Sequence, residues 1–353
     1  MNIYKYIFLN ILLTTLLFLN GCGSLKILEE SPYLYSPQYN SETNRFNNSN
    51  GESNNKSFFE FLTFAYNFFT RPFDEIEEIG FPILDPFTQK DSLSGRQIVW
   101  IGQSTLLLTI DGVTILTDPV FSMRASPFTF IGPKRVTPPA MKVPDLPKID
   151  AVVISHNHYD HLDIESLKQI NRLQPNIRYF VPLGIKQILL ENGLKFVHEL
   201  DWWENLTFNE LTFTATPVNH WSSRSINDRN KTLWSGWMIE WPKYRFYFAG
   251  DTGYSNDFIT TRNRLGSPDL AAIPIGAYEP RSFMKKSHVN PEESVRIFED
   301  LSAKLAVAIH WGTFKLTTEL LEEPPERLRN ELKKKKINPS KFLSLKHGQK
   351  LHL

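Results

Sequence analysis

The chain has little cysteine, almost no excess charge and no long apolar run outside its N-terminus. Of its 353 residues, Cys22 is the one cysteine, which excludes a disulfide framework and leaves His, Asp and Glu to hold any metal in the body of the protein. The 39 basic and 38 acidic residues balance to a formal net charge of +1, which gives no electrostatic basis for binding nucleic acid. The length favours one large domain with appendages.

An apolar run at residues 6 to 19 follows Lys5 and ends just before Gly21-Cys22. The run is shorter than the ~20 residues that a membrane-spanning helix needs, so it predicts a secretory signal peptide, residues 1–21. A small residue directly before cysteine resembles the lipobox of bacterial lipoproteins, which implies a lipid anchor on Cys22 and a place in the bacterial cell envelope. Gly23 carries no inner-membrane retention signal of the Asp type, so we expect an outer-membrane lipoprotein facing the periplasm. The alternative is an uncleaved signal anchor with an incidental cysteine.

Two segments separate this run from the body of the chain. Seven of the seventeen residues from Asn40 to Lys56 are asparagine, and residues 22–56 as a whole predict a disordered tether. Residues 57–95 predict a helical and extended segment that packs on the body. Its first part, "SFFEFLTFAYNFF", has aromatic residues on nearly every face of a helix, so a dimer contact or a segment touching a membrane are the alternatives.

The body of the chain, residues 96–353, begins with strand-like runs. "QIVWIG", "STLLLTI" and "VTILTD" are rich in β-formers, and Asp111-Gly112 predicts a hairpin between the last two. Helical patterns follow at residues 164–173, where Asp163 is a suitable N-cap, and at 291–301, with further strand-like runs between and after them. A meander of strands that then alternates with helices predicts an α/β fold of mixed sheets covered by helices.

The stretch "SHNHYDHLD", residues 155–163, predicts a metal site. His156 and His158 are two apart at the end of a strand, so their side chains point the same way and can reach one metal. Asp160 and His161 follow where the chain turns into a helix, and they suit a second metal. A catalytic zinc site takes three protein ligands, so four candidates in one loop indicate two metals.

Further candidate ligands come where later strands end, at His220, Asp251 and His310. A carboxylate can give an oxygen to each of two metals, and Asp251 is the candidate for this bridge. Gly250 and Gly253 flank it in a tight turn. A set made only of His and Asp suits zinc first, and iron or manganese is also chemically acceptable.

The order of these residues resembles a known superfamily. H-x-H-x-D-H followed by His, Asp and His is similar to the metallo-β-lactamases. The segments "WIGQSTLLLTIDGVTILTDP", "VVISHNHYDHLD", "FAGDTGY" and "AIHWGTF" resemble, from about Trp100 onward, the N-acyl-phosphatidylethanolamine-hydrolysing phospholipases D and their bacterial relatives. The resemblance implies an αββα sandwich with two Zn²⁺ ions at one edge. It assigns one zinc to His156, His158 and His220, the other to Asp160, His161 and His310, and the bridge to Asp251.

Three further positions are read from the same resemblance. His288, in "MKKSHVNPEE", matches a histidine that faces the phosphate, and Asp118, in "LTDP", matches an acidic residue behind the metals. An orienting role fits Asp118, and a structural role in the turn is the alternative. Gln103 departs from the family, which has histidine at this position of W-[LI]-G-H-[SA]-T.

The resemblance implies a membrane phospholipid as substrate. N-acyl-phosphatidylethanolamine would be hydrolysed to phosphatidate and an N-acylethanolamine, and relatives suggest a homodimer. Three alternatives stay open: a hydrolase of the same fold that acts on another ester, lactone or phosphodiester; a β-lactamase; and a non-catalytic surface lipoprotein with a relic site.

Overall fold

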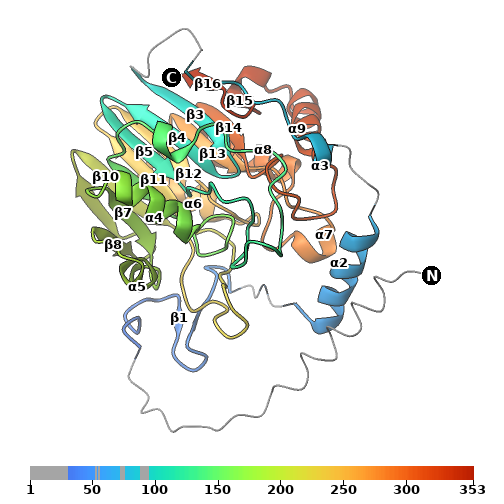
Figure 1. Ribbon diagram of the computed structural model, residues 1–353, viewed down its shortest axis with the longest axis horizontal. Helices are drawn as coiled ribbons and strands as arrows, with labels where there is room; N and C mark the ends of the chain where they lie inside the picture. The colour runs from blue at the N-terminus through green and yellow to red at the C-terminus, as the bar shows by residue number, and fades with distance from the viewer. Residues whose placement is uncertain (1–30, 52–53, 55, 72–75, 88–94) are drawn as a thin grey trace.

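Two seven-stranded sheets form the centre of the computed structural model, which describes residues 31–51, 54, 56–71, 76–87 and 95–353 (Figure 1). The first sheet has the order β16-β3-β4-β5-β6-β7-β8, antiparallel from β16 to β5 and parallel from β5 to β8. Its strands are β3 (Gln97–Gly102), β4 (Thr105–Ile110), β5 (Val113–Thr117), β6 (Ala151–Val153), β7 (Arg178–Pro182), β8 (Val197–Leu200) and β16 (Lys350–His352).

The second sheet repeats this mixed arrangement. Its order is β15-β14-β13-β12-β11-β10-β9, antiparallel from β9 to β12 and parallel from β12 to β15. Its strands are β9 (Asn205–Phe208), β10 (Leu211–Thr216), β11 (Gly236–Trp241), β12 (Tyr244–Phe248), β13 (Leu270–Pro274), β14 (Leu305–Ile309) and β15 (Phe342–Leu343).

The main core lies between the two sheets. Alternate side chains of a strand point to one face, so each sheet contributes every second residue to this layer. Phe180 of β7 stacks on Phe213 of β10 with ring centroids 3.8 Å apart, and both rings are fully buried. Trp237 of β11 also crosses the interface, where its Nε1 donates a hydrogen bond to the carbonyl of Ile154 at 2.9 Å. These contacts fix the two sheets face to face.

Helices cover the outer face of each sheet. Leu167 and Ile170 of α4 (Ile164–Leu173) and Leu189 of α5 (Lys186–Glu191) form a second core with the outward residues of the first sheet. On the other side, α8 (Pro291–Leu301) packs on β13, and α6 (Asp257–Leu265) and α9 (Glu323–Lys334) pack beside it. The layers are therefore α, β, β and α, which confirms the fold expected from the sequence.

Local signals in the sequence place several of these elements. Asp111 and Gly112 have φ of 50° and 84°, which is the left-handed conformation that a tight hairpin between β4 and β5 requires. Asp163 caps α4 by accepting a hydrogen bond from the N–H of Ser166, and Asn290 forms a capping box with Glu293 at the start of α8. Both helices have the bounds predicted from the sequence.

The predicted tether is wrong for residues 31–51. Here β1 (Tyr39–Asn40) and β2 (Arg45–Phe46) form a hairpin, and Phe46 is fully buried against Tyr33 and Tyr39. These three aromatic rings supply apolar contacts that the asparagine-rich composition does not lead one to expect. Asparagine side chains of the segment also form hydrogen bonds with backbone groups of the body. The predicted signal peptide, residues 1–21, and Cys22 lie outside the described residues.

The helix α2 (Phe58–Thr70) lies apart from the sheets, beside α7 (Arg281–Met284) (Figure 1). Ser57 and Glu60 form its capping box. Phe64 stacks on Phe283 of α7 with centroids 4.8 Å apart, yet four other aromatic residues are 56–78% exposed: Phe59, Phe61, Tyr66 and Phe69. The segment therefore packs on the body by one side only, and a short helix, α3 (Ile76–Ile79), follows it. In the part of the chain that the structure describes, no helix is both long and apolar enough to cross a membrane.

Candidate metal centre

The candidate ligands come together at one edge of the sandwich, each just after a strand. The loop after β6 carries His156 to His161, His220 follows β10, Asp251 follows β12 and His310 follows β14. The turn after β12 needs glycine, because Gly250 has a φ of 60° and an added Cβ would come within 2.5 Å of Cβ of Ser155. The topology thus brings residues more than 150 positions apart to one place.

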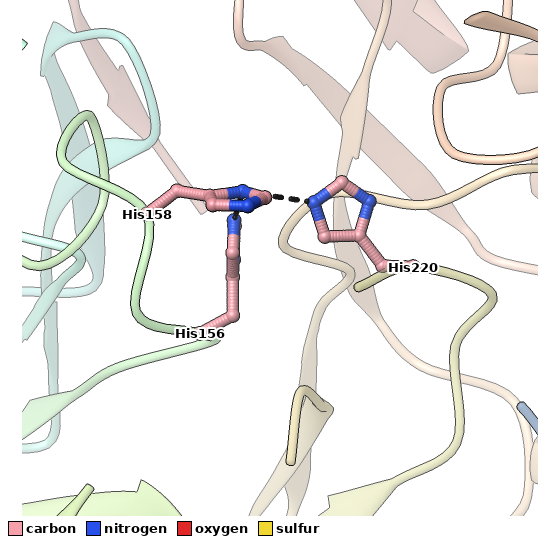
Figure 2. Close-up of side chains that lie close together, drawn as sticks. All are labelled: His156, His158 and His220. Atoms are coloured by element: carbon pink, nitrogen blue, oxygen red, sulfur yellow. Dashed lines mark hydrogen bonds between the residues drawn. The ribbon is translucent and has the colours of Figure 1, made fainter. Parts of the chain in front are cut away.

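Three histidines make the first donor group. Nε2 of His156 lies 2.8 Å from Nδ1 of His158, which lies 3.3 Å from Nε2 of His220 (Figure 2). Three nitrogens bound tetrahedrally to one zinc at 2.0–2.1 Å are roughly 3.3 Å apart, so the spacing matches a metal site. The three rings come from two different loops and point their nitrogens at a common centre (Figure 2).

Two carboxylates and two histidines make the second donor group. Nε2 of His161 and Nε2 of His310 each lie 3.1 Å from Oδ2 of Asp251, and Oδ2 of Asp160 lies 3.4 Å and 3.1 Å from the same two nitrogens. Oδ2 of Asp251 is also 3.9 Å from Nε2 of His220 in the first group. Asp251 therefore stands between the groups, where the sequence predicts the bridge.

Hydrogen bonds behind the donors fix the ring orientations. Nδ1 of His161 contacts Oδ2 of Asp118 at 2.7 Å, and Nδ1 of His220 contacts the carbonyl of Ser287 at 2.9 Å. Since a carbonyl or carboxylate oxygen only accepts, Nδ1 carries the proton in both rings and Nε2 is free to bind a metal. Asp118 thus has the orienting contact that was expected of it.

The charges of the site suit a cation. Burial lowers the pKa of His158 and of His220 to about 3, which keeps both rings in the neutral form that metal ligands need. Burial alone would raise the pKa of Asp251, but the nearby imidazoles of His161 and His310 outweigh it and hold this pKa well below its usual range.

Two buried donor atoms test whether a metal fits. Oδ1 of Asp251 makes no hydrogen bond to any residue that the structure describes, and Nε2 of His161 faces the carboxylate oxygens of Asp160 and Asp251 at 3.4 Å and 3.1 Å. A buried oxygen without a partner is costly, and a cation held by these residues would give it one. The residues therefore fit two metal ions, one in each donor group.

His288 lies beside the two donor groups and belongs to neither of them. It follows α7, is 9% exposed and points Nδ1 at Oδ2 of Asp251 from 3.8 Å. Its backbone is held by the carbonyl of Met284 and by Arg281, whose Nη1 donates to the carbonyl of His288 at 2.7 Å. The imidazole is thus placed next to the predicted bridge.

Gln103 also belongs to the site, immediately after β3. Its Nε2 donates to Oδ2 of Asp160 at 2.8 Å, and its carbonyl accepts from the N–H of His310 at 3.0 Å. Gln103, Asp118 and His310 have φ of 51°, 32° and 61°, a region that residues other than glycine rarely adopt. Such strained backbone gathers at functional sites, where neighbouring contacts hold it in place.

Sequence reasoning missed two supporting residues. The hydroxyl of Ser155 donates to Oδ2 of Asp118 at 2.6 Å, and its N–H donates to Oδ1 at 2.7 Å. Its place next to His156 is the one signal that points to it. Ser287 acts through its carbonyl, which no sequence pattern reveals.

Comparison with known proteins agrees with the geometry. A family model described as a beta-lactamase superfamily domain matches residues 113–311. The chain belongs to the metallo-β-lactamase superfamily. A possible metal-dependent hydrolase of this superfamily's fold from Veillonella parvula superposes with a TM-score of 0.60 at 21% identity, over 74% of this chain and 100% of the other.

Sequence relatives are closer than this structural neighbour. N-acyl-phosphatidylethanolamine-hydrolyzing phospholipase D 1 of Caenorhabditis elegans is 42% identical over 270 residues, which are 73% of this chain and 76% of the relative. The mitochondrial enzyme of the same description from Saccharomyces cerevisiae is 41% identical over 236 residues, 65% of this chain and 50% of its own length. The chain is therefore a metal-dependent hydrolase of the metallo-β-lactamase superfamily, related to these phospholipases.

Proposed function

We propose that this hydrolase is a phosphodiesterase of the phospholipase D type with two zinc ions. Its substrate would be N-acyl-phosphatidylethanolamine, and its products phosphatidate and an N-acylethanolamine. The observation that carries the proposal is the 42% identity over 270 residues to the worm phospholipase. The two donor groups joined at Asp251 supply the site that such a reaction needs.

His156, His158 and His220 would hold one zinc, and Asp160, His161 and His310 the other, with Asp251 between them. Iron or manganese is compatible with the same donors. When bound, two metal ions would supply a water of lowered pKa and would stabilise the charged oxygens of the phosphodiester. The chain's own part is to fix the ligand rings through Asp118 and the carbonyl of Ser287.

His288 would contact the phosphoryl group. Burial lowers its pKa to about 3, so the ring is neutral near pH 7 and can donate one hydrogen bond to an oxygen that gains negative charge. Arg281 holds this part of the chain by its bond to the carbonyl of His288 and by an ion pair with Glu293 at 2.6 Å. The backbone that carries this donor is thus held before substrate arrives.

A lipid bilayer would be the surface on which the enzyme works. The exposed aromatic residues of α2 suit the interface between water and acyl chains. Phe64 stacks on Phe283, five positions before His288 in the chain, so α2 packs on the segment that leads to His288. A lipid anchor on Cys22, an envelope location on the outer membrane facing the periplasm, and a homodimer complete the proposal.

The test is product analysis with the full-length, zinc-loaded protein and vesicles that contain N-acyl-phosphatidylethanolamine. We expect phosphatidate and N-acylethanolamine from the wild type, and no product from His156→Ala. If the protein binds two metals per chain but does not turn over this lipid, the proposed substrate is contradicted. The substrate would then be another ester, lactone or phosphodiester. A chain that takes up no metal would contradict the metal mechanism itself.

A further inference from the structure

Two asparagines from the N-terminal segment hold the peptide groups of His220. The side-chain oxygen Oδ1 of Asn48 accepts a hydrogen bond from the N–H of His220 at 3.0 Å, and Nδ2 of Asn54 donates to the carbonyl of His220 at 2.8 Å. A backbone N–H only donates and a carbonyl only accepts, so these contacts fix which way each amide faces. Both asparagines are buried, with 7% and 3% exposure.

The two amides replace the sheet hydrogen bonds that His220 lacks. The residue lies beyond the end of β10, where its neighbour Asn219 pairs with Gly253. A buried peptide needs partners for its N–H and its C=O, and Asn48 and Asn54 supply them from more than 160 positions earlier in the chain. The backbone position of this candidate ligand therefore depends on the N-terminal segment.

The asparagines are themselves held in place. We call residues 45–51 together with Asn54 the N-terminal latch. Oδ1 of Asn48 also accepts from Nε1 of the buried Trp234 at 3.0 Å, and Nη2 of Arg229 donates to the carbonyl of Asn54 at 2.6 Å. The N–H of Phe46 bonds the carbonyl of Asn230 at 2.8 Å. The latch is therefore joined by several hydrogen bonds to the loop that follows His220.

The ring of His220 is held by another segment of the chain. The carbonyl of Ser287 accepts from Nδ1 at 2.9 Å, while Nε2 lies 3.3 Å from Nδ1 of His158. Once the peptide and Nδ1 are both held, Nε2 keeps one direction, toward the first donor group. Contacts that orient ligands in this way typically change metal affinity by about 10- to 100-fold when they are removed.

We propose that Asn48 and Asn54 are positioning residues of the metal centre. The N-terminal latch would then be a structural part of this centre. The inference rests on the metal binding of the proposed function. It predicts that the metal held by His156, His158 and His220 binds more weakly when either side-chain amide is lost, while the metal of the second donor group is unaffected.

The test uses the full-length, metal-free protein titrated with Co²⁺ alone. The visible spectrum of the bound cobalt and competition with a chelator give two dissociation constants without any turnover, and His156→Ala shows which of them belongs to the first group. We expect Asn48→Ala and Asn54→Ala to weaken this one about 10- to 100-fold. Ser49→Ala is the matched control, because Ser49 lies in the same latch and bonds Asp257 at 2.7 Å instead of His220.

A pair of aspartate variants separates positioning from general stability. Asn48→Asp keeps the accepting oxygen and should bind cobalt within about threefold of the wild type. Asn54→Asp replaces the donor with a second acceptor facing the carbonyl of His220, so it should bind at least as weakly as Asn54→Ala. Metal-free melting temperatures of the alanine variants should fall below that of Ser49→Ala, because each variant leaves a buried peptide group of His220 without its partner. If an alanine variant does not fold, the cobalt affinities of Asn48→Asp and Asn54→Asp still test the proposal.

The outcomes distinguish this inference from the proposed function. Two tight cobalt equivalents in Asn48→Ala and Asn54→Ala would overturn the inference and leave the proposed metal centre intact. Equal weakening by Ser49→Ala would also overturn it, since the effect would then be one of stability. A wild-type chain that takes up no cobalt would remove the proposed function and this inference together.

Discussion

Oδ2 of Asp118 lies 2.7 Å from Nδ1 of His161, and both side chains are fully buried. Asp118 follows β5 and His161 follows β6, two neighbouring parallel strands whose carboxyl ends meet at the same edge of the sheet. The same carboxylate accepts from the N–H and the hydroxyl of Ser155. Asp118 therefore links the end of β5 by hydrogen bonds to the loop after β6, which carries four candidate ligands.

Asp118→Asn should weaken metal binding at the second donor group by about 10- to 100-fold. The amide has one accepting oxygen, so either Ser155 or His161 faces an N–H group where it needs an acceptor. Chelator competition measures the affinity. Asp150→Asn is the control, because Asp150 accepts from the N–H of Thr114 in the same sheet and touches no candidate ligand. Wild-type affinity in Asp118→Asn would show that this contact does not orient His161.

Gln103→Ala should weaken the metal of the second donor group by about tenfold and leave the first unchanged. The reason is the loss of the hydrogen bond from Nε2 to Asp160 at 2.8 Å. Alanine tolerates the positive φ of 51° better than a β-branched residue would. The measurement is cobalt binding to each group, and an equal loss at both would indicate a distorted fold instead. Gln103→His should retain the affinity, because an imidazole N–H can donate to Asp160 in place of the amide.

The candidate ligands are the part of the site that the sequence predicts best. Strand ends are visible as the last apolar residue before a polar one, and Asp251 and His310 both stand at such ends. Parallel strands bring their carboxyl ends to one edge, so strand order alone brings the ligands together. The dense loop at His156 to His161 then indicates where the others must converge.

The N-terminal latch shows what such reasoning does not reach. Its asparagines make the segment look disordered by composition, yet Asn48 acts through hydrogen bonds to residues 172 and 186 positions away. No periodicity records a side chain that pairs with a distant backbone group. The nearest signal is Phe46 with Tyr33 and Tyr39, three aromatic rings in a polar segment, which supply enough apolar contact to order it.

Replacing Phe59 and Phe69 of α2 by serine should reduce binding to phospholipid vesicles by tenfold or more. The two rings are 78% and 73% exposed, and burying such a side chain contributes about 1.5–3 kcal/mol. Vesicle sedimentation measures the effect. Turnover of a short-chain soluble substrate should stay unchanged, since neither ring takes part in the stacking of Phe64 on Phe283.

The matched control for α2 is Leu173→Ser. Leu173 is 57% exposed at the end of α4, on the outer face of the first sheet. Its loss should leave vesicle binding as it is. Equal binding by the wild type and the α2 variant would mean that the exposed rings do not face the bilayer and would favour the dimer contact, which analytical ultracentrifugation would then detect.

Burial of His347 should make the fold sensitive to acid. It is 1% exposed, lies between Trp100 and Phe81, and its Nε2 lies 3.0 Å from Oγ1 of Thr313. Burial, with a smaller contribution from Arg135, lowers its pKa to about 3 from the ordinary value of 6.5. The folded chain therefore keeps this ring neutral over a pH range in which the unfolded chain binds a proton.

The free energy of unfolding should consequently fall as the pH drops below about 6.5, by up to about 1.4 kcal/mol per pH unit from this group, and level off near the folded pKa. His347→Gln removes the titrating ring, so the advantage of the wild type over this variant should shrink steadily from pH 7 to pH 4. Urea unfolding in the presence of a chelator measures both proteins without any contribution from bound metal. A difference between the two that does not change with pH would mean that the ring is protonated in the folded state as readily as in the unfolded one.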